Sequence, residues 1–415
     1  MRTHAGILVL ALALGATLSF PFGASAAEKT TSLDQETLRR GFTVTSEDTI
    51  FRIGIPPGAF SAPVRVTISD ESTAELQPPA GSSFVTPQYT FVTESGQQST
   101  RLPFRVTFAL PAEPFVKRTI AYLNDEQHAW QELPTKVGFS TLSASSSWAS
   151  AHVVVLEQKV DLSATPWSSK SLVALESTSG TVLASYNETR LQPIASLTKL
   201  MTALVGLELK PQWNRLIRYS RQDNRPGGAL SVLPGEQMRI KDAFAAMLIG
   251  SANNATETFV RSTGLSEKQF VRRMNQKAKD LGLLSTHFSD ATGLSAKNIS
   301  TAYEYALIAR AAFAQKEILA LTSRKKYTFV TRNTQKKHTI KNTNLLLQNS
   351  TVVRAGKTGF TDEAGYCLVL NAVDSLRRTE ILVLLGTATS QARFLEAEAL
   401  LRLMYAAPLP RSLDG

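Results

Sequence analysis

Three short motifs after residue 190 contain side chains suited to nucleophilic catalysis. Ser196 and Lys199 lie three residues apart, Ser251 and Asn253 follow, and Lys357 comes last. A serine hydroxyl becomes a nucleophile when a nearby base removes its proton. Residues three apart on a helix share one face, so Lys199 is the candidate base for Ser196. The sequence therefore indicates a serine nucleophile activated by a lysine.

Lys199 can act as this base only when its amine is neutral. The reference pKa of lysine is about 10.4, and a shift to near 7 means destabilising the cation by roughly 4–5 kcal/mol. Burial and a second nearby cation both lower the pKa of a lysine. The apolar run Leu200–Leu204 is expected to bury Lys199, and Lys357 is the candidate for the second cation.

The position of Ser196 allows two interpretations. Pro193 precedes it and a helix is predicted over 196–209, so Ser196 falls near a helix N-terminus, where the helix dipole stabilises a developing oxyanion. The alternative is that Ser196 only caps this helix. A second Ser-x-x-Lys sequence, Ser323 to Lys326, lies in a cationic stretch before a predicted strand and is interpreted as solvated surface.

The second motif, Ser251-Ala252-Asn253, follows an apolar helix that ends at Gly250. A hydroxyl and an amide at this point would relay a proton and hold a substrate amide. The alternative is that Ser251 only forms a turn or caps the helix predicted over 254–262.

The third motif, Lys357-Thr358-Gly359, is predicted to precede a strand over 366–370. Glycines on both sides of Lys357 and Thr358 would let another backbone approach closely. An extended substrate would then pair along the strand edge. The run Gly356-Lys357-Thr358 is also found at the end of a phosphate-binding P-loop, but that pattern requires a glycine where Thr351 stands.

Together and in this order, the motifs resemble those of the penicillin-recognising serine enzymes. Further segments narrow the resemblance to the low-molecular-mass D-alanyl-D-alanine carboxypeptidases. These segments are 193–203, 233–236, 251–255, 274–282, 286–294 and 356–361. The resemblance covers residues 167–407 and implies a β-lactamase/transpeptidase-like fold for them.

The resemblance implies the chemistry of the site. Ser196 would attack the carbonyl between two D-alanines of a peptidoglycan stem peptide, forming an acyl-enzyme, while Lys199 takes its proton. Ser251 and Asn253 would complete the proton relay and hold the acyl-donor amide. The implied substrate-binding residues are Lys357, Thr358, Gly359 and Phe360, of which Lys357 and Thr358 would meet the terminal carboxylate.

The backbone N–H groups of Ser196 and Phe360 would form the oxyanion hole. The resemblance also implies β-lactam antibiotics as covalent inhibitors, and no cofactor or metal is expected. Three alternatives stay open: a D,D-endopeptidase of peptidoglycan cross-links, a β-lactamase, and a non-catalytic wall-binding protein. No Glu-x-x-Leu-Asn segment of a class A β-lactamase lies between Ser251 and Lys357.

The elements that must position these residues predict an α+β fold. A β-hairpin is expected over 172–186 and strands over 327–331, 366–372 and 381–386. Helices are predicted over 196–209, 240–247, 254–262, 267–281, 301–314 and 391–405. Strands at both ends with helices between them favour an antiparallel sheet plus a helical cluster.

Residues 27–160 have a different pattern. Short β-branched or alternating runs at 42–45, 64–68, 104–108, 119–123 and 153–155 are separated by turn formers. This spacing favours a small all-β sandwich of unknown role, preceding the catalytic domain at 167–407.

Residues 1–26 are expected to be a secretory signal peptide. They combine a basic start, an apolar run over 6–18 and the small-x-small sequence Ala24-Ser25-Ala26. An uncleaved anchor is the alternative, and either places the protein in the periplasm or another extracytoplasmic part of the envelope. The chain ends soon after the last predicted helix, so no C-terminal membrane anchor is expected.

The chain has 415 residues, 43% of them hydrophobic, a single cysteine and a net charge of +11. Residues 27–160 have 11 Lys and Arg against 14 Asp and Glu, a net −3, whereas residues 161–415 have 33 against 20, a net +13. The cationic excess is densest over 324–341. Export excludes nucleic acid as a partner, which leaves an anionic wall polymer or a merely solvated basic face.

Overall fold

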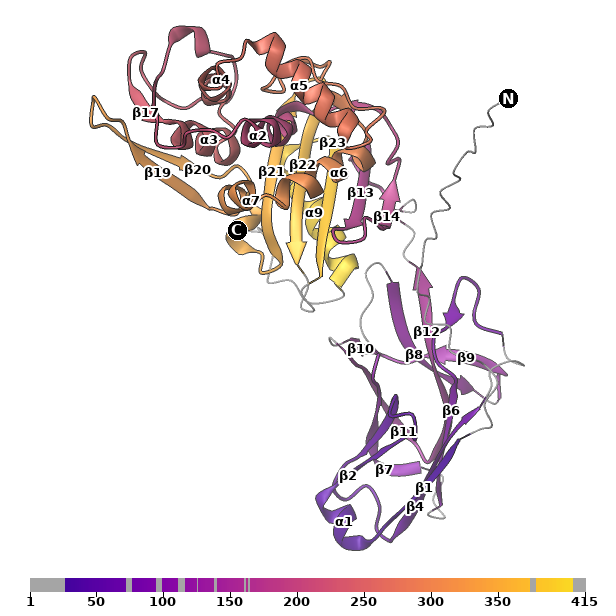
Figure 1. The fold of residues 1–415 in the computed structure, drawn as a ribbon. Helices are drawn as coiled ribbons and strands as arrows, with labels where there is room; N and C mark the ends of the chain where they lie inside the picture. Colours follow the sequence, from indigo (N-terminus) through magenta and orange to yellow (C-terminus); the bar gives the residue numbers. More distant parts are fainter. Residues whose placement is uncertain are drawn as a thin grey trace, which may run out of the picture. The chain divides into compact units, whose positions relative to one another are not determined.

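The computed structural model describes residues 27–405 except 72–76, 95–98, 111–115, 125, 138–139, 160–161, 163–164 and 374–377. The expected signal peptide and the end of the chain after residue 405 lie outside the described residues. The chain divides into two compact units (Figure 1). The first extends to Leu110 and includes Thr119–Lys136 and Leu142–Glu157, and the second is formed mainly by the chain from Gln158 onward.

The first unit is β-rich, as predicted. In its described residues, one antiparallel sheet has the order β1 (Glu28–Leu33), β4 (Val64–Glu71), β6 (Gln88–Glu94), β12 (Ser150–Lys159), β8 (Val116–Asn124) and β9 (Ala129–Glu132), with β5 (Ser83–Phe84) beside β12. The other has the order β10 (Lys136–Val137), β11 (Leu142–Trp148), β7 (Ser99–Phe108), β3 (Phe51–Ile55) and β2 (Phe42–Thr45).

One short helix, α1 (Gln35–Arg40), was not expected in this region. Its first turn is stabilised by Asp34, whose carboxylate accepts the backbone N–H of Thr37. Six residues are too few to show a helical period in the sequence.

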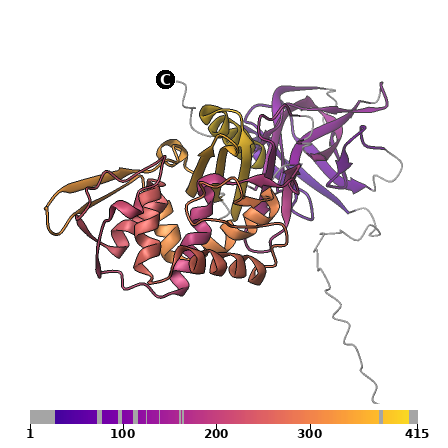
Figure 2. The same cartoon turned by 90° about the horizontal axis from the view of Figure 1, so that it is seen from above.

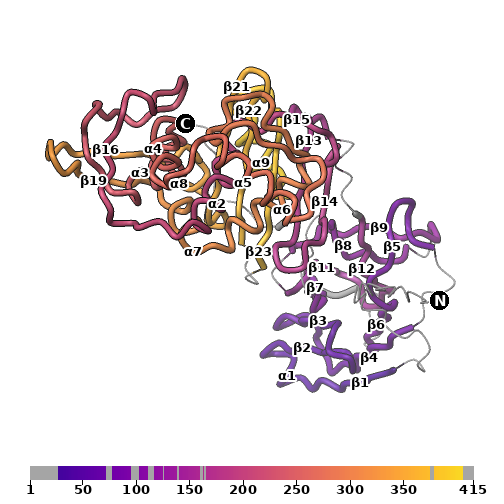
Figure 3. The backbone as a smooth tube through the Cα atoms, turned by 45° about the horizontal axis from the view of Figure 1, so that its top comes forward, coloured from indigo at the N-terminus to yellow at the C-terminus, as the bar shows by residue number. Residues whose placement is uncertain are grey.

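Aromatic side chains join the two sheets of the first unit, whose backbone is drawn in Figure 3. Phe51 on β3 stacks on Tyr89 of β6 with ring centroids 5.1 Å apart, and it contacts Phe108 of β7 at 4.9 Å. Phe91 of β6 meets Phe104 of β7 at 6.4 Å. All five rings are fully buried, so the sheets pack face to face over an aromatic core.

The second unit is α+β and is built on a five-stranded antiparallel sheet. Its order is β14 (Val182–Tyr186), β13 (Ser171–Glu176), β23 (Thr379–Thr387), β22 (Gly365–Val373) and β21 (Val353–Thr361). The predicted hairpin is confirmed as β13 and β14, and β13 pairs with β23, so strands from both ends of this unit meet. β21 forms an edge of the sheet.

The third motif precedes the predicted strand, which is β22, and it also lies within a strand that the sequence did not predict, because Lys357, Thr358 and Gly359 are in the middle of β21. Two glycines lower the strand propensity of this segment, which hid the strand in the sequence.

Helices cover both faces of this sheet (Figures 1 and 2). Successive residues of β13 and β23 point to opposite faces of the sheet and are apolar on both, which explains this arrangement. Val173 and Val383 join the core under the helical cluster, while Leu172 and Leu384 face α9 (Ser390–Tyr405). The cluster consists of α2 (Thr198–Glu208), α3 (Ile240–Ile249), α4 (Asn253–Ser262), α5 (Glu267–Asp280), α6 (Ala302–Phe313) and α7 (Lys316–Thr322); α8 (Leu346–Asn349) precedes β21.

Short elements complete the second unit. They are the 3-10 turns η2 (Ala195–Leu197) and η3 (Arg221–Asp223) and the strand pairs β15 (Gln192–Pro193) with β18 (Ile299–Ser300), β16 (Leu216–Arg218) with β17 (Gln237–Arg239), and β19 (Lys326–Val330) with β20 (Lys337–Lys341). Within the described residues, no helix is both long and apolar enough to cross a membrane.

The aromatic core of the first unit gives a test of its packing. We expect Phe51→Ala to lower the free energy of unfolding of this unit by about 3–5 kcal/mol, because it leaves a cavity among buried rings. The matched change Phe42→Ala, at a side chain that is 41% exposed, should cost less than about 1 kcal/mol. Urea unfolding of the full chain, followed by circular dichroism, measures both, and equal losses would contradict this account of the core.

Candidate active site

Ser196 lies in the turn η2, immediately before α2. The predicted helix start at Ser196 is therefore wrong by two residues, because α2 begins at Thr198. The capping interpretation is wrong as well, because the residues at the cap positions of η2 and α2 are Ile194 and Leu197, and neither cap uses a side chain. The hydroxyl of Ser196 instead contacts Lys199, whose Nζ lies 2.8 Å from Oγ.

The backbone that presents Ser196 is held in an uncommon conformation. Ala195 has φ +47°, a left-handed value that costs a non-glycine residue about 1–2 kcal/mol. Two glycines fit closely around it. A Cβ at Gly293 would lie 2.0 Å from the carbonyl oxygen of Ala195, and a Cβ at Gly359 would lie 3.0 Å from that of Ile194. The backbone that approaches Gly359 closely is therefore the turn that carries Ser196.

Lys199 is fully buried and its amine has three polar neighbours. Nζ lies 2.7 Å from Oδ1 of Asn253, 2.6 Å from the carbonyl oxygen of Thr292 and 2.8 Å from Oγ of Ser196. The first two oxygens can only accept hydrogen bonds. A neutral amine has two N–H groups and one lone pair, so donating to Asn253 and Thr292 leaves the lone pair for the hydroxyl of Ser196.

The electrostatics of the site favour this neutral form. Burial lowers the pKa of Lys199 to about 7, although the carboxyl groups of Asp290 and Glu257 act in the opposite direction. Burial also lowers the pKa of Lys357 well below its ordinary value, with smaller contributions from Lys199 and Arg393. Burial, rather than the expected second cation, is thus the main cause of the shift at Lys199.

The second motif lies beside Lys199 at the start of α4. Asn253 is the first residue of that helix, and its Nδ2 donates to the carbonyl oxygen of Pro226 at 2.6 Å. Its backbone N–H donates to the carbonyl oxygen of Gly228 at 2.7 Å. Ser251 is not the helix cap, which is Ala252, and it accepts a hydrogen bond from Lys357. The loop over 224–230 therefore holds the second motif in position through the two hydrogen bonds that Asn253 donates to it.

The third motif faces the second from β21. Nζ of Lys357 donates to Oγ of Ser251 and to the carbonyl oxygen of Thr358, both at 2.7 Å. The hydroxyl of Thr358 lies 2.6 Å from that of Thr343. Phe360 is 47% exposed and stacks on Tyr366 with ring centroids 4.3 Å apart. All three motifs therefore meet in one place, and hydrogen bonds link their side chains.

Sequence reasoning missed three side chains that support this site. Asp290 accepts backbone N–H groups of Thr292, Gly293 and Ser295, which fixes the carbonyl oxygen of Thr292 toward Lys199. The sequence Asp290 to Gly293 is the signal of a tight turn and could have identified this role.

Glu257 and Arg393 are the other two. Glu257 follows Asn253 by four residues and so shares its helix face, which was a usable signal. Burial raises its pKa to about 7, and it pairs with Arg225 at 3.2 Å. Arg393 is buried and donates to the carbonyl oxygens of Gly359 and Cys367, so it supports β21 beneath the third motif.

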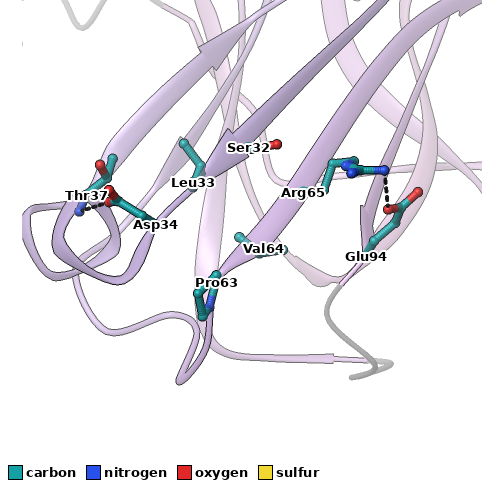
Figure 4. Close-up of a pocket in the computed structure, with 8 residues that line it drawn as sticks. All are labelled: Ser32, Leu33, Asp34, Thr37, Pro63, Val64, Arg65 and Glu94. Carbon is teal, nitrogen blue, oxygen red and sulfur yellow. Dashed lines mark hydrogen bonds and ion pairs between the residues drawn. The ribbon is translucent and has the colours of Figure 1, made fainter.

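The first unit contains a separate cavity, shown in Figure 4. Its lining includes the ion pair between Arg65 and Glu94, whose atoms lie 3.5 Å apart. None of the motif residues lines it. Among the described residues, no three His, Cys, Asp or Glu side chains are grouped so that they could hold a metal ion.

Comparison with known proteins identifies the family. The family model described as peptidase S11, D-alanyl-D-alanine carboxypeptidase, matches residues 158–389, which include all three motifs. This match spans more than half of the chain. The chain therefore belongs to the D-alanyl-D-alanine carboxypeptidase family of serine peptidases.

Two curated relatives share 36% identity with the chain. D-alanyl-D-alanine carboxypeptidase DacF of Bacillus subtilis aligns over 235 residues, covering 54% of this chain and 59% of its own length. A D-alanyl-D-alanine endopeptidase of Haemophilus influenzae aligns over 226 residues, covering 54% of this chain and 77% of its own length. The chain thus spans somewhat more than half of the first relative and about three quarters of the second.

Solved structures show the same fold in the second unit. The Streptomyces K15 DD-transpeptidase has a TM-score of 0.56 and 24% identity, covering 59% of this chain and 99% of that one. A D-alanyl-D-alanine carboxypeptidase of Mycobacterium tuberculosis H37Rv has a TM-score of 0.52 and 26% identity, covering 56% of this chain and 89% of that one. The second unit therefore resembles DD-transpeptidase structures.

The contact between Gly293 and the turn at Ala195 gives a test of the site geometry. We expect Gly293→Ala to slow covalent labelling of Ser196 by a fluorescent penicillin about 100-fold, because an added Cβ displaces the nucleophile turn. Gly282 is the matched control, since it also has positive φ but nothing lies within 4 Å of an added Cβ. Gly282→Ala should cost about 1–3 kcal/mol of stability without slowing the labelling. Equal labelling rates for the two variants would contradict the role of Gly293.

The lowered pKa of Lys199 gives a second test. Only the neutral amine can take the proton of Ser196, so the second-order labelling rate should rise with pH and level off above about 7. At pH 5 we expect roughly a hundredth of the plateau rate, because about 1% of the amine is then neutral. Stopped-flow labelling between pH 5 and 9 measures this profile, and a rate independent of pH over that range would contradict the assignment of the base.

Proposed function

We propose that this protein is a serine D,D-carboxypeptidase that removes the terminal D-alanine from peptidoglycan stem peptides. The observation that carries the proposal is the contact of Ser196 with the buried amine of Lys199, whose two N–H groups have their own acceptors in Asn253 and Thr292. Family membership supports the same reaction.

The first half of the reaction forms an acyl-enzyme. Oγ of Ser196 attacks the carbonyl carbon between two D-alanines, and its proton passes to the lone pair of Lys199. The backbone N–H groups of Ser196 and Phe360 are the proposed donors to the oxyanion, each worth a few kcal/mol in such sites. The close approach of η2 to β21 at Gly359 supports this pairing.

Collapse of the intermediate breaks the peptide bond and releases D-alanine. Its amine must gain the proton that Lys199 took from Ser196, and the hydroxyl of Ser251, held by Nζ of Lys357 at 2.7 Å, is the proposed relay. Water then attacks the ester carbonyl and gives one proton to Lys199, which passes it to Oγ of Ser196 as the shortened peptide is released.

Recognition of the terminal carboxylate is assigned to the third motif. Lys357 is buried near Arg393, whose guanidinium adds positive charge at this end of the site. A bound carboxylate stabilises the cationic form of Lys357, and the hydroxyl of Thr358 provides a neutral donor. Asn253 holds the acyl-donor amide from the other side.

A D,D-endopeptidase is the second candidate. Relatives named D-alanyl-D-alanine endopeptidase in Haemophilus influenzae and Pseudomonas aeruginosa align over 77% and 76% of their own lengths, against 59% for the Bacillus carboxypeptidase. The two activities share one acylation step and differ in the leaving group, which is free D-alanine in one and a cross-linked peptide in the other.

We also propose the organisation of the whole chain. A signal peptide over 1–26 exports it to the periplasm or another extracytoplasmic part of the envelope. A β-sandwich domain over 27–160 follows, and the catalytic domain over 167–407 contains the chemistry. The first domain contributes none of the three motifs.

The nucleophile is tested by mapping the penicillin adduct. We expect a labelled penicillin to modify Ser196 and Ser196→Ala to abolish the adduct, because the hydroxyl of Ser196 is the one that contacts the proposed base, Lys199. Ser323→Ala is the matched control, since Ser323 also precedes a lysine by three residues but is exposed. Tryptic mapping by mass spectrometry measures the adduct. Modification that survives in Ser196→Ala would refute the proposal, and an adduct hydrolysed within seconds would favour a β-lactamase.

The leaving group is tested with defined muropeptides. A carboxypeptidase releases D-alanine from a monomeric pentapeptide and leaves a cross-linked dimer intact, and mass spectrometry separates the two products. Cleavage of the cross-linked dimer, with the pentapeptide left intact, would show that the protein is an endopeptidase and not a carboxypeptidase.

A further inference from the structure

The hairpin of β19 and β20 concentrates positive charge on one face. Residues 324–341 include seven Lys and Arg and no Asp or Glu, and the nearest acidic residues along the chain are Glu317 and Asp362. In Figures 1 and 2 the hairpin projects outward from the second unit.

Strand alternation sorts the side chains of this hairpin onto two faces. Phe329, His338 and Ile340 are buried on the inner face. The outer face is exposed, and we name it the cationic ribbon; it consists of Lys326, Thr328, Val330, Lys337, Thr339 and Lys341. Lys337 and Lys341 are four residues apart on one strand, so the ribbon presents charge over about 14 Å.

The ribbon sets like charges directly opposite each other. Lys326 pairs with Lys341 in the antiparallel register, an arrangement that destabilises a strand pair. Among the described residues, neither these two lysines nor Lys337 form a salt bridge. An anionic partner outside this chain would relieve the repulsion.

The hairpin is fixed at both ends. At its tip, the backbone N–H of Arg332 donates to the carbonyl oxygen of Gln237, and Oδ1 of Asn333 accepts the N–H of Gln237, both at 2.8 Å. At its base, β20 leads to Thr343, whose hydroxyl contacts Thr358 of the third motif. The backbone of the hairpin is therefore held in place at both ends, and the ribbon ends two residues from Thr343, which contacts the candidate site.

We propose that the cationic ribbon binds the carboxylates of peptidoglycan peptides next to the one being cleaved, and so holds the polymer at the site. This inference rests on the proposed function, because it names how the same site gains its polymeric substrate. Acidic peptides repeat along a wall polymer, so their carboxylates can pair with a row of lysines without a fixed spacing. Such binding weakens as the salt concentration rises. A membrane-binding surface needs large apolar side chains among its basic ones, whereas Val330 is the single apolar residue of the ribbon.

The test compares two triple variants of the full chain. Lys326→Gln, Lys337→Gln and Lys341→Gln together remove the ribbon charge. The control, Lys268→Gln, Arg272→Gln and Lys279→Gln, removes the same charge from exposed positions of α5. Co-sedimentation with purified peptidoglycan sacculi at about 50 mM salt should fall roughly tenfold for the ribbon variant and less than twofold for the control. The difference should vanish at about 0.5 M salt.

Further measurements distinguish binding by the ribbon from other causes of lost sedimentation. The ribbon variant should be labelled by penicillin at the wild-type rate and should unfold at the same or a higher temperature, because it loses only repulsion. Sacculi whose carboxyls have been amidated should bind wild type and ribbon variant equally. Equal binding of both triple variants to untreated sacculi overturns the proposal. Selective loss of binding to phosphatidylglycerol vesicles, with sacculus binding intact, assigns the ribbon to a membrane and also overturns it. A wild-type chain that penicillin does not label refutes the proposed function instead.

Discussion

The buried amine of Lys199 is the constraint on which the rest of the site depends. An ammonium ion at this position would be costly, because burial favours the neutral base even though the carboxyl groups of Asp290 and Glu257 act in the opposite direction. Two oxygens that can only accept, on Asn253 and Thr292, hold the N–H groups and leave the lone pair for Ser196. Each of these oxygens comes from a different segment, so the chemistry requires the start of α4, the turn at Asp290 and the turn η2 to meet within hydrogen-bonding distance.

The fold brings these segments together by close backbone approach. The sheet places β21 at its edge, where Gly359 lets the nucleophile turn pack against the strand. Gly293 does the same for the loop that carries Thr292. The left-handed backbone of Ala195 is a local cost that this packing compensates, in keeping with the strain that active sites store. The two-sided core of the sheet, with helices on one face and α9 on the other, supplies the rigidity that holds these contacts.

The sequence predicted the parts of this arrangement that depend on side-chain type and periodicity. The β13–β14 hairpin, most of the helices and the Ser196–Lys199 pairing follow from alternation, from the helical period and from spacing. The carbonyl oxygens of Thr292, Pro226 and Gly228 could not be foreseen, because every residue has a backbone carbonyl and only the tertiary fold selects one. The strand position of Lys357 was obscured by its flanking glycines. The helix α1 depends on one capping interaction and has no period to detect.

The central claim is that Lys199 is a neutral amine near physiological pH, and its own titration tests this most directly. In the full chain labelled with ¹³C at lysine Cε, the Lys199 resonance is identified by its absence from Lys199→Met and followed by NMR. The account predicts a midpoint near pH 7, well below the reference pKa of lysine, which is about 10.4. A Lys199 resonance that stays in the ammonium form up to pH 9 would contradict the account.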